Sequence, residues 1–180
     1  LEKNILAKYG SPTPRAMVES GLYHISLLEK FDFDDIVLSL KSSNVATMYN
    51  AYVLAAEKCR YPLHLGVTEA GRRGMGNVKS DIGIGSLLLD GIGDTLRVSL
   101  SGDPEPEVQA GINILRAIGL RGGVQFVSCP TCGRTRVDVP QIARAVEKAF
   151  CDCQKDVTIA VMGCVVNGPG EARGADIALC

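Results

Sequence analysis

Three cysteines and one glutamate near the C-terminal end of the sequence could together hold a metal. The motif CPTC supplies Cys129 and Cys132, and the motif GCVVNGPGE supplies Cys164 and Glu171. The Gly-Pro-Gly segment predicts a sharp turn with positive φ angles, which would return Glu171 toward the atom that Cys164 binds. The alternative is an ordinary surface turn with Glu171 in water. A carboxylate is a poor ligand for a purely structural thiolate site, but it suits a metal that must exchange a ligand.

The CxxC pair alone leaves the kind of site open. It is compatible with a zinc half-site, a redox dithiol or part of an iron–sulfur cluster. We expect no helix directly after it, which disfavours a thioredoxin-type dithiol. Zinc held by Cys129, Cys132, Cys164 and either Cys151 or Cys153 is an alternative that the spacing allows.

Polar residues also follow three apolar runs in the first part of the chain. Lys41 ends the first run, and Thr68 and Glu69 follow the second. Arg97 and Ser99 share one face of the third. Cations and hydroxyls that converge at the carboxyl ends of parallel strands predict a phosphate site, with Glu69 as an acid/base group. Each residue alone could be a solvated strand end or part of a salt bridge, but a guanidinium buried in the apolar third run would need a partner.

The elements that would position these residues alternate between strands and helices. Apolar, β-branched runs predict strands over residues 34–40, 61–68, 94–100, 121–128 and 157–163. Helical spacing of apolar residues predicts helices over residues 12–31, 42–58, 80–89, 103–118 and 139–150. This order indicates βαβ units with parallel sheets. A change of composition after Leu120 predicts two domains, residues 1–121 and 122–180, and both cysteine motifs directly follow strands of the second.

Composition and charge exclude several classes of protein. The formal net charge is −1, so no basic excess points to nucleic acid or to an anionic membrane surface. The apolar stretches are too short to cross a bilayer, and Leu1–Gly10 shows no export signal. Seven cysteines in a chain without an export signal favour metal or redox chemistry over a disulfide framework. We therefore expect a cytoplasmic protein that binds neither nucleic acid nor membrane.

Five motifs together resemble a known enzyme family. Along the chain they are SLKSS, PLHLGVTEAG, GIGDTLRVSL, VSCPTCGRT and VMGCVVNGPGEARGAD. They are similar to those of the 4-hydroxy-3-methylbut-2-enyl diphosphate synthases, the IspG or GcpE family of the non-mevalonate (MEP) pathway of isoprenoid biosynthesis. The resemblance implies an α/β fold, the C-terminal half of a TIM (β/α)8 barrel followed by a small α/β iron–sulfur domain.

The resemblance also implies an activity and its partners. A bacterial-type cytoplasmic oxidoreductase would convert 2-C-methyl-D-erythritol 2,4-cyclodiphosphate to 4-hydroxy-3-methylbut-2-enyl diphosphate by a two-electron reduction. Electrons would come from flavodoxin or ferredoxin. The enzyme would be a homodimer in which the cluster domain of one subunit acts on the barrel of the other.

Individual residues receive roles from the same resemblance. The ligands of a 4Fe–4S cluster would be Cys129, Cys132, Cys164 and Glu171. The residues that bind the diphosphate would be Lys41, Arg97 and Ser99, with Thr68 nearby. Glu69 would be the acid/base residue, and Asn167 would contact the substrate from the cluster side.

Only three barrel strands are predicted, whereas a closed TIM barrel has eight. We therefore expect the chain to be the C-terminal portion of a longer enzyme whose other half supplies further strands and substrate-binding arginines. Two other functions stay open from the residues. One is a zinc-stabilised binding module without redox activity, and the other is a cluster-free lyase that uses Lys41 as a Schiff-base lysine.

Overall fold

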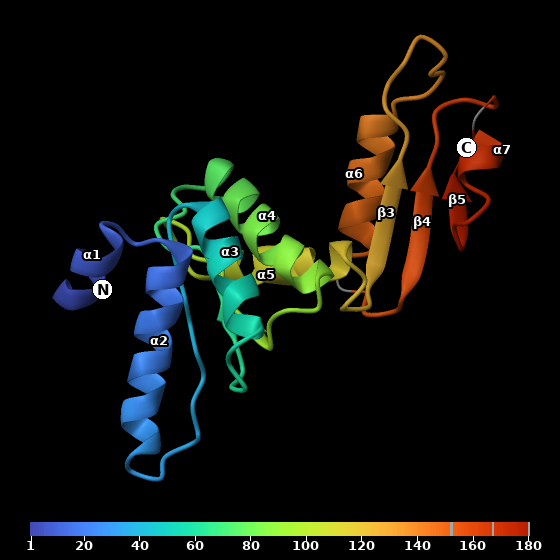
Figure 1. Ribbon diagram of the computed structural model, residues 1–180. Helices are drawn as coiled ribbons and strands as arrows, with labels where there is room; N and C mark the ends of the chain where they lie inside the picture. Colours follow the sequence, from blue (N-terminus) through green and yellow to red (C-terminus); the bar gives the residue numbers. More distant parts are fainter. Residues whose placement is uncertain (152, 167, 180) are drawn as a thin grey trace. The chain divides into compact units, whose positions relative to one another are not determined.

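The computed structural model describes residues 1–151, 153–166 and 168–179, and the chain divides into two compact units (Figure 1). They are Leu1–Ile118, the first unit, and Gly119–Cys180, the second unit. Both units combine helices with parallel strands, so the chain is a mixed α/β protein, as the sequence predicts. Within the described residues, no helix is both long enough and apolar enough to cross a membrane.

The first unit contains short parallel strands and the helices that follow them. Its elements are α1 (Lys3–Tyr9), α2 (Pro14–Glu29), α3 (Val45–Ala56), β1 (His64–Leu65), α4 (Met75–Leu89), β2 (Thr95–Leu96) and α5 (Glu105–Ala117). β1 pairs with β2, and the segment before α3 joins them through the isolated parallel bridges Leu38↔Leu63 and Ser42↔Val67. The three predicted strands are therefore neighbours, but regular pairing is much shorter than predicted. The described residues form no closed barrel.

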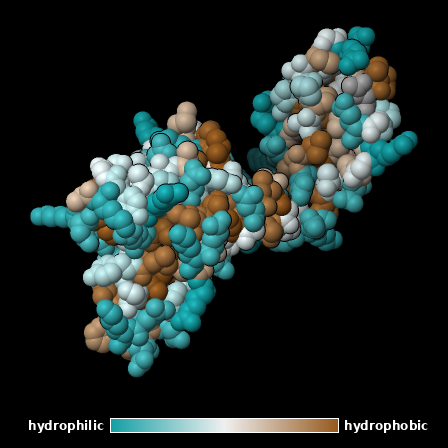
Figure 2. Space-filling model, in the orientation of Figure 1, coloured by the Kyte–Doolittle hydropathy of each residue, from teal (hydrophilic) through white to brown (hydrophobic). Residues whose placement is uncertain are grey.

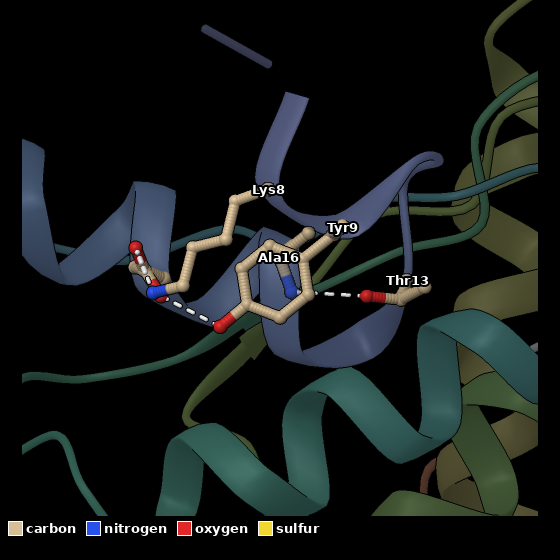
Figure 3. Close-up of polar contacts among 5 residues, drawn as sticks. Lys8, Tyr9, Thr13 and Ala16 are labelled. Atoms are coloured by element: carbon tan, nitrogen blue, oxygen red, sulfur yellow. Dashed lines mark hydrogen bonds and ion pairs between the residues drawn. The ribbon is translucent and has the colours of Figure 1, made fainter. Parts of the chain in front are cut away.

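Two helices of the first unit begin at residues whose side chains cap free backbone N–H groups. At the start of α2, Thr13 Oγ1 accepts a hydrogen bond from Ala16 N at 3.2 Å (Figure 3). Asn44 Oδ1 accepts from Thr47 N at 2.8 Å at the start of α3. Both predicted helices are thus confirmed.

A polar contact joins α1 to α2. Lys8 Nζ lies 2.7 Å from Glu19 Oε2, and Tyr9 OH donates to the same oxygen at 2.7 Å (Figure 3). The hydrogen bond between Lys8 and Glu19 raises the pKa of the ammonium and lowers that of the carboxyl. Because the pair is exposed to water, its contribution to stability is small.

α4 begins at Met75, earlier than the predicted start at Ser80. Asn77 Oδ1 accepts a hydrogen bond from Gly74 N at 3.2 Å and so caps the helix. The segment also packs closely, since a Cβ at Gly76 would lie 2.7 Å from Leu100 Cδ2. The helix therefore extends five residues further toward the N-terminus than the predicted range of 80–89.

One face of the three parallel segments is covered by helices and is apolar. Its buried side chains are Leu38, Leu40, Leu63, Leu65, Val67 and Val98. They belong to the same core as Met48 and Tyr52 of α3 and Ile84 of α4. Because side chains alternate along a strand, the intervening residues lie on the opposite face. This face, called the polar face below, carries Ser39, Lys41, His64, Thr68, Arg97 and Ser99.

The segment over residues 36–41 also borders a groove of about 480 Å³ that α2 lines on its other side. Large apolar residues are exposed there, Val37 at 57% and Leu28 at 42%. Figure 2 shows hydrophobic residues at the surface of the first unit. In the described residues this segment pairs only with the segment that contains β1, so its outer edge has no strand beside it.

The second unit is built on a regular parallel sheet. Its elements are β3 (Val124–Ser128), α6 (Val139–Ala149), β4 (Val157–Val161), α7 (Gly168–Glu171) and β5 (Ile177–Leu179). The sheet order is β3-β4-β5, with Val124 opposite Val157 and Ile159 opposite Ile177. Ile159, Ala160 and Met162 are buried. The strands predicted before both cysteine motifs and the helix between them are confirmed.

Candidate functional site

The two cysteine motifs follow neighbouring strands and line one cavity. Cys129 and Cys132 come after β3, and Cys164 comes after β4. Cys129 N donates to Val161 O at 3.1 Å, which continues the pairing of the two strands to the first thiol. The cavity has a volume of about 130 Å³, and its lining includes all three cysteines and Glu171. The parallel pairing thus brings the four predicted ligands to one place.

Backbone groups hold the Cys129 thiol. Gly163 N donates a hydrogen bond to Cys129 Sγ at 3.1 Å. A Cβ at Gly163 would lie 2.7 Å from Val139 Cγ2 and 2.9 Å from Thr135 Cγ2, so no larger residue fits without movement. A bond from N–H to sulfur stabilises the thiolate, which is the form of cysteine that ligates metals.

Cys132 begins a tight turn that Thr135 closes. Cys132 N donates to Thr135 Oγ1 at 3.0 Å, and Thr135 N donates to Cys132 O at 3.0 Å. Hydrogen bonds from the Arg134 backbone and from the Thr135 side chain lower the pKa of the Cys132 thiol. The turn therefore also favours a thiolate.

Helix α7 forms over Gly168–Glu171, and the predicted sharp turn with positive φ was wrong at Gly170. Gly168 N donates to Cys164 O at 3.1 Å, and Gly168–Glu171 form α7. Pro169 has the fixed φ that suits the first turn of a helix. One helical turn is enough to bring Glu171 to the cavity that Cys164 lines.

The other cysteines do not contribute to this cavity. Cys151 is exposed and Cys153 is half-buried after α6, and neither lines the cavity, so a zinc site that includes one of them is not favoured. Asn167 and Cys180 lie outside the described residues. Across residues 1–151, 153–166 and 168–179, no three His, Cys, Asp or Glu side chains are grouped closely enough to hold a single metal ion.

In the first unit, the polar face brings Lys41 and Arg97 together. The pairing register places Lys41, Gly66 and Arg97 side by side on three neighbouring segments. Burial and the charge of Arg97 lower the pKa of the Lys41 ammonium. In the described part of the chain, neither cation forms an ion pair with a carboxylate. Two neighbouring cations without an acidic partner form a site that an anionic ligand would stabilise.

His64 lies on the same face, although it was not among the predicted site residues. Its Nδ1 lies 2.8 Å from Thr95 Oγ1. Burial, and then the charges of Lys41 and Arg97, lower the pKa of the imidazole. The spacing of His64 and Thr68 along one strand face is the signal that could have placed it there.

Arg97 is exposed, so the prediction of a buried guanidinium was wrong. The neighbouring residues Leu96 and Val98 pack toward α5, where a Cβ at Gly111 would lie 3.1 Å from Leu96 Cδ1. Alternation along β2 therefore directs Arg97 to the polar face. Ser99 shares this face and is half-buried.

Thr68 and Glu69 follow β1 at the carboxyl end of the parallel segments. Thr68 N donates to Ser42 O at 3.2 Å, which fixes Thr68 close to the segment that carries Lys41. Glu69 is exposed and has a φ of 52°, in the left-handed region that residues other than glycine seldom adopt. Backbone strain of this kind is concentrated at functional sites.

Comparison with known proteins gives matches over both units. The GcpE TIM-barrel domain matches residues 1–112, and the GcpE protein C-terminal domain matches residues 125–180. A protein named 4-hydroxy-3-methylbut-2-en-1-yl diphosphate synthase (flavodoxin) from Clostridium perfringens is 58% identical over 99% of this chain and 52% of its own length. Proteins of the same name from Caldanaerobacter subterraneus subsp. tengcongensis and Geobacter sulfurreducens are 59% and 54% identical, each over 99% of this chain and 51% of its own length.

The chain spans about half the length of the curated relatives it matches. The two matched domains follow one another in the order that the motifs predict. From the matches over both units, the chain belongs to the GcpE family.

Proposed function

We propose that this chain is part of a 4-hydroxy-3-methylbut-2-enyl diphosphate synthase. The substrate, 2-C-methyl-D-erythritol 2,4-cyclodiphosphate, gains two electrons, opens its ring and loses one hydroxyl oxygen as water. The observation that carries the proposal is the single cavity lined by Cys129, Cys132, Cys164 and Glu171. The names of the relatives support the same reaction.

The chemistry of this cavity fits a 4Fe–4S cluster. Such a cluster has four irons, and three thiolates leave one iron for another donor, which Glu171 would supply. The hydrogen bonds to Cys129 Sγ and around Cys132 are of the kind that stabilise cluster thiolates. When bound, the cluster would supply the electrons for the reduction. Glu171, as an oxygen donor among thiolates, would be the most readily exchanged ligand.

The polar face of the first unit would bind the diphosphate. Lys41 and Arg97 supply two neighbouring positive charges that have no carboxylate partner among the described residues. Ser99 and Thr68 add hydroxyl donors on the same face. Charged hydrogen bonds to phosphate oxygens would hold the ligand at the carboxyl ends of the strands.

Glu69 would transfer a proton to the hydroxyl oxygen that leaves as water. Its position at the end of β1 and its left-handed backbone support this role. Asn167 would contact the substrate from the cluster side, a role that rests on the family resemblance.

The chain would supply two domains, residues 1–121 and 122–180. The first would be the C-terminal half of a TIM barrel, and the parallel segments with an unpaired outer edge beside α2 support this. The second would be the cluster domain. The names of the relatives include flavodoxin, and either flavodoxin or ferredoxin would supply the electrons. The enzyme would be a cytoplasmic homodimer in which the cluster domain of one subunit acts on the barrel of the other.

Replacing the carboxylate ligand tests this function. In the intact protein, purified without oxygen, Glu171→Ala should retain the iron and sulfide of the three-thiolate cluster but lose most of its turnover of the cyclic diphosphate. Glu147→Ala is the matched control, because Glu147 is exposed on α6 and does not line the cavity. Full turnover of Glu171→Ala would show that the carboxylate is not a functional ligand.

A further inference from the structure

Gly66 occupies the middle of the polar face, between the two cations. Leu38 pairs with Leu63 and Ser42 with Val67, so the same register sets Lys41 opposite Gly66. On the other side, the pairing of β1 with β2 continues through Arg97 N, which donates to Leu65 O at 2.9 Å, and sets Arg97 opposite Gly66. The residue between the two cations therefore has no side chain.

The space above Gly66 is filled by Lys41. A Cβ at Gly66 would lie 3.3 Å from Lys41 Cε and 3.7 Å from Lys41 Cδ, so the aliphatic stem of the lysine passes over the glycine. Because Cε lies closer to this Cβ than Cδ does, the stem runs from its own segment toward Gly66, and the charge of Arg97 acts on the ammonium at its end. The same Cβ would lie 3.0 Å from Arg97 O, so Gly66 also packs closely against the backbone of the next segment. The backbone of Gly66 is not in the left-handed region, so its conformation alone does not require glycine.

Two positive charges held side by side on the polar face are electrostatically unfavourable unless another interaction offsets their repulsion. Lys41 and Arg97 repel each other, and the described residues provide no carboxylate that pairs with either cation. A free lysine would turn its ammonium away from the arginine and into water. The bare surface of Gly66 instead lets the stem lie along the strands, with the ammonium already near Arg97.

We propose that Gly66 is a positioning residue, which sets the Lys41 ammonium beside Arg97 so that both cations can bind one diphosphate group. This inference rests on the proposed function of the polar face as the diphosphate site. A methyl group at position 66 would lift the lysine stem and separate the two cations without removing either charge.

Binding of inorganic pyrophosphate to the intact protein tests the proposal, with affinity measured by calorimetry. Gly66→Ala should weaken the affinity about tenfold, the effect expected for one charged hydrogen bond. Gly85→Ala is the matched control, since this buried glycine of α4 has no atom closer than 4.0 Å to a Cβ. It should bind pyrophosphate as the unmodified protein does.

A double-mutant cycle distinguishes positioning from general packing. Lys41→Met removes the ammonium and should itself weaken binding by about tenfold or more. If Gly66 acts through Lys41, adding Gly66→Ala to Lys41→Met should change the affinity little further. Full additivity of the two losses would overturn the proposal, as would unchanged affinity in Gly66→Ala.

The same data separate this inference from the proposed function. An unchanged affinity in Lys41→Met would reject both the diphosphate site and the role of Gly66. A loss in Lys41→Met with none in Gly66→Ala would reject only the role of Gly66. Should Gly66→Ala fail to fold, the double variant Gly66→Ala with Lys41→Ala is the second test. If the double variant folds, the steric contact with Lys41 caused the failure, as the proposal requires. If it also fails to fold, the contact with the Arg97 backbone is the cause, and the proposal is overturned.

Discussion

The two units place their chemistry at the ends of parallel strands, but they hold it by different means. In the second unit, the pairing of β3 with β4 continues to Cys129 N, and Gly163 N bonds the Cys129 thiol. The backbone itself therefore shapes the cavity. In the first unit, regular pairing is limited to β1 and β2, and the cations of the polar face are arranged by side chains that cross the strands.

Tyr52 illustrates this dependence on side chains. Between the two isolated bridges, its hydroxyl accepts a hydrogen bond from Leu40 N at 3.0 Å and donates to His64 O. Burial raises the pKa of the Tyr52 phenol, so the hydroxyl keeps its proton. A residue of α3 thus replaces a direct backbone bond between the segments that carry Lys41 and His64. We therefore expect substitutions of side chains that do not touch the ligand to disturb the site of the first unit more than that of the second.

The largest expected effect separates the two sites. Cys164→Ala should remove most of the iron and sulfide and abolish turnover, because two remaining cysteines cannot hold the cluster. Pyrophosphate affinity should stay unchanged, since the polar face contains no part of the cavity. Metal analysis and calorimetry on the intact protein measure both quantities.

Cys151→Ala provides the control for that variant, because Cys151 is exposed and does not line the cavity. It should keep its cluster. Equal loss of iron from both variants would show that the cavity does not define the metal site.

A smaller effect is expected when the Tyr52 hydroxyl is removed. Tyr52→Phe leaves the buried Leu40 N without its partner and should lower the free energy of unfolding by about 1–3 kcal/mol. Denaturant unfolding measures the change. Tyr49→Phe is the matched control on the same helix, since the Tyr49 hydroxyl bonds the exposed Asp90 at 2.7 Å and should contribute less. An equal loss of unfolding free energy in both variants would show that the Tyr52 hydroxyl does not bridge the two segments in a way that stabilises the fold.

The smallest expected effect concerns pH. The folded-state pKa of His64 lies below its ordinary value of 6.5 because of burial and the nearby cations, so the unfolded chain binds the proton more readily. The contribution of the neutral imidazole to stability is therefore present above pH 6.5 and is lost as the pH falls through the folded-state pKa. His64→Gln should reduce the loss of stability on acidification. The same substitution at exposed His24 is the control, and identical pH profiles for both variants would contradict the account.

Local signals in the sequence were sufficient for most of the fold. The helices over residues 12–31 and 42–58 were predicted close to where α2 and α3 form, because the caps that begin them, Thr13 and Asn44, depend only on residues a few positions away. The two cysteine motifs could be placed after strands for the same reason. The start of α4 was predicted too late, because it depends on the packing of Gly76 against Leu100, which lies far along the chain.

The site was harder to predict where it depends on contacts between strands. The exposure of Arg97 follows from which face of β2 packs on α5, and the local sequence does not state this. The contact between Gly66 and Lys41 and the bridging role of Tyr52 exist only after the segments pair. The Gly-Pro-Gly turn was wrong because Pro169 also suits the first turn of a helix, and α7 forms there.

The central claim is that the cavity of the second unit holds a 4Fe–4S cluster. The most direct test is the metal and acid-labile sulfide content of the intact protein, purified and reconstituted without oxygen. The account predicts about four irons and four sulfides per chain, as a cubane cluster requires. Stoichiometric zinc with no sulfide would contradict it.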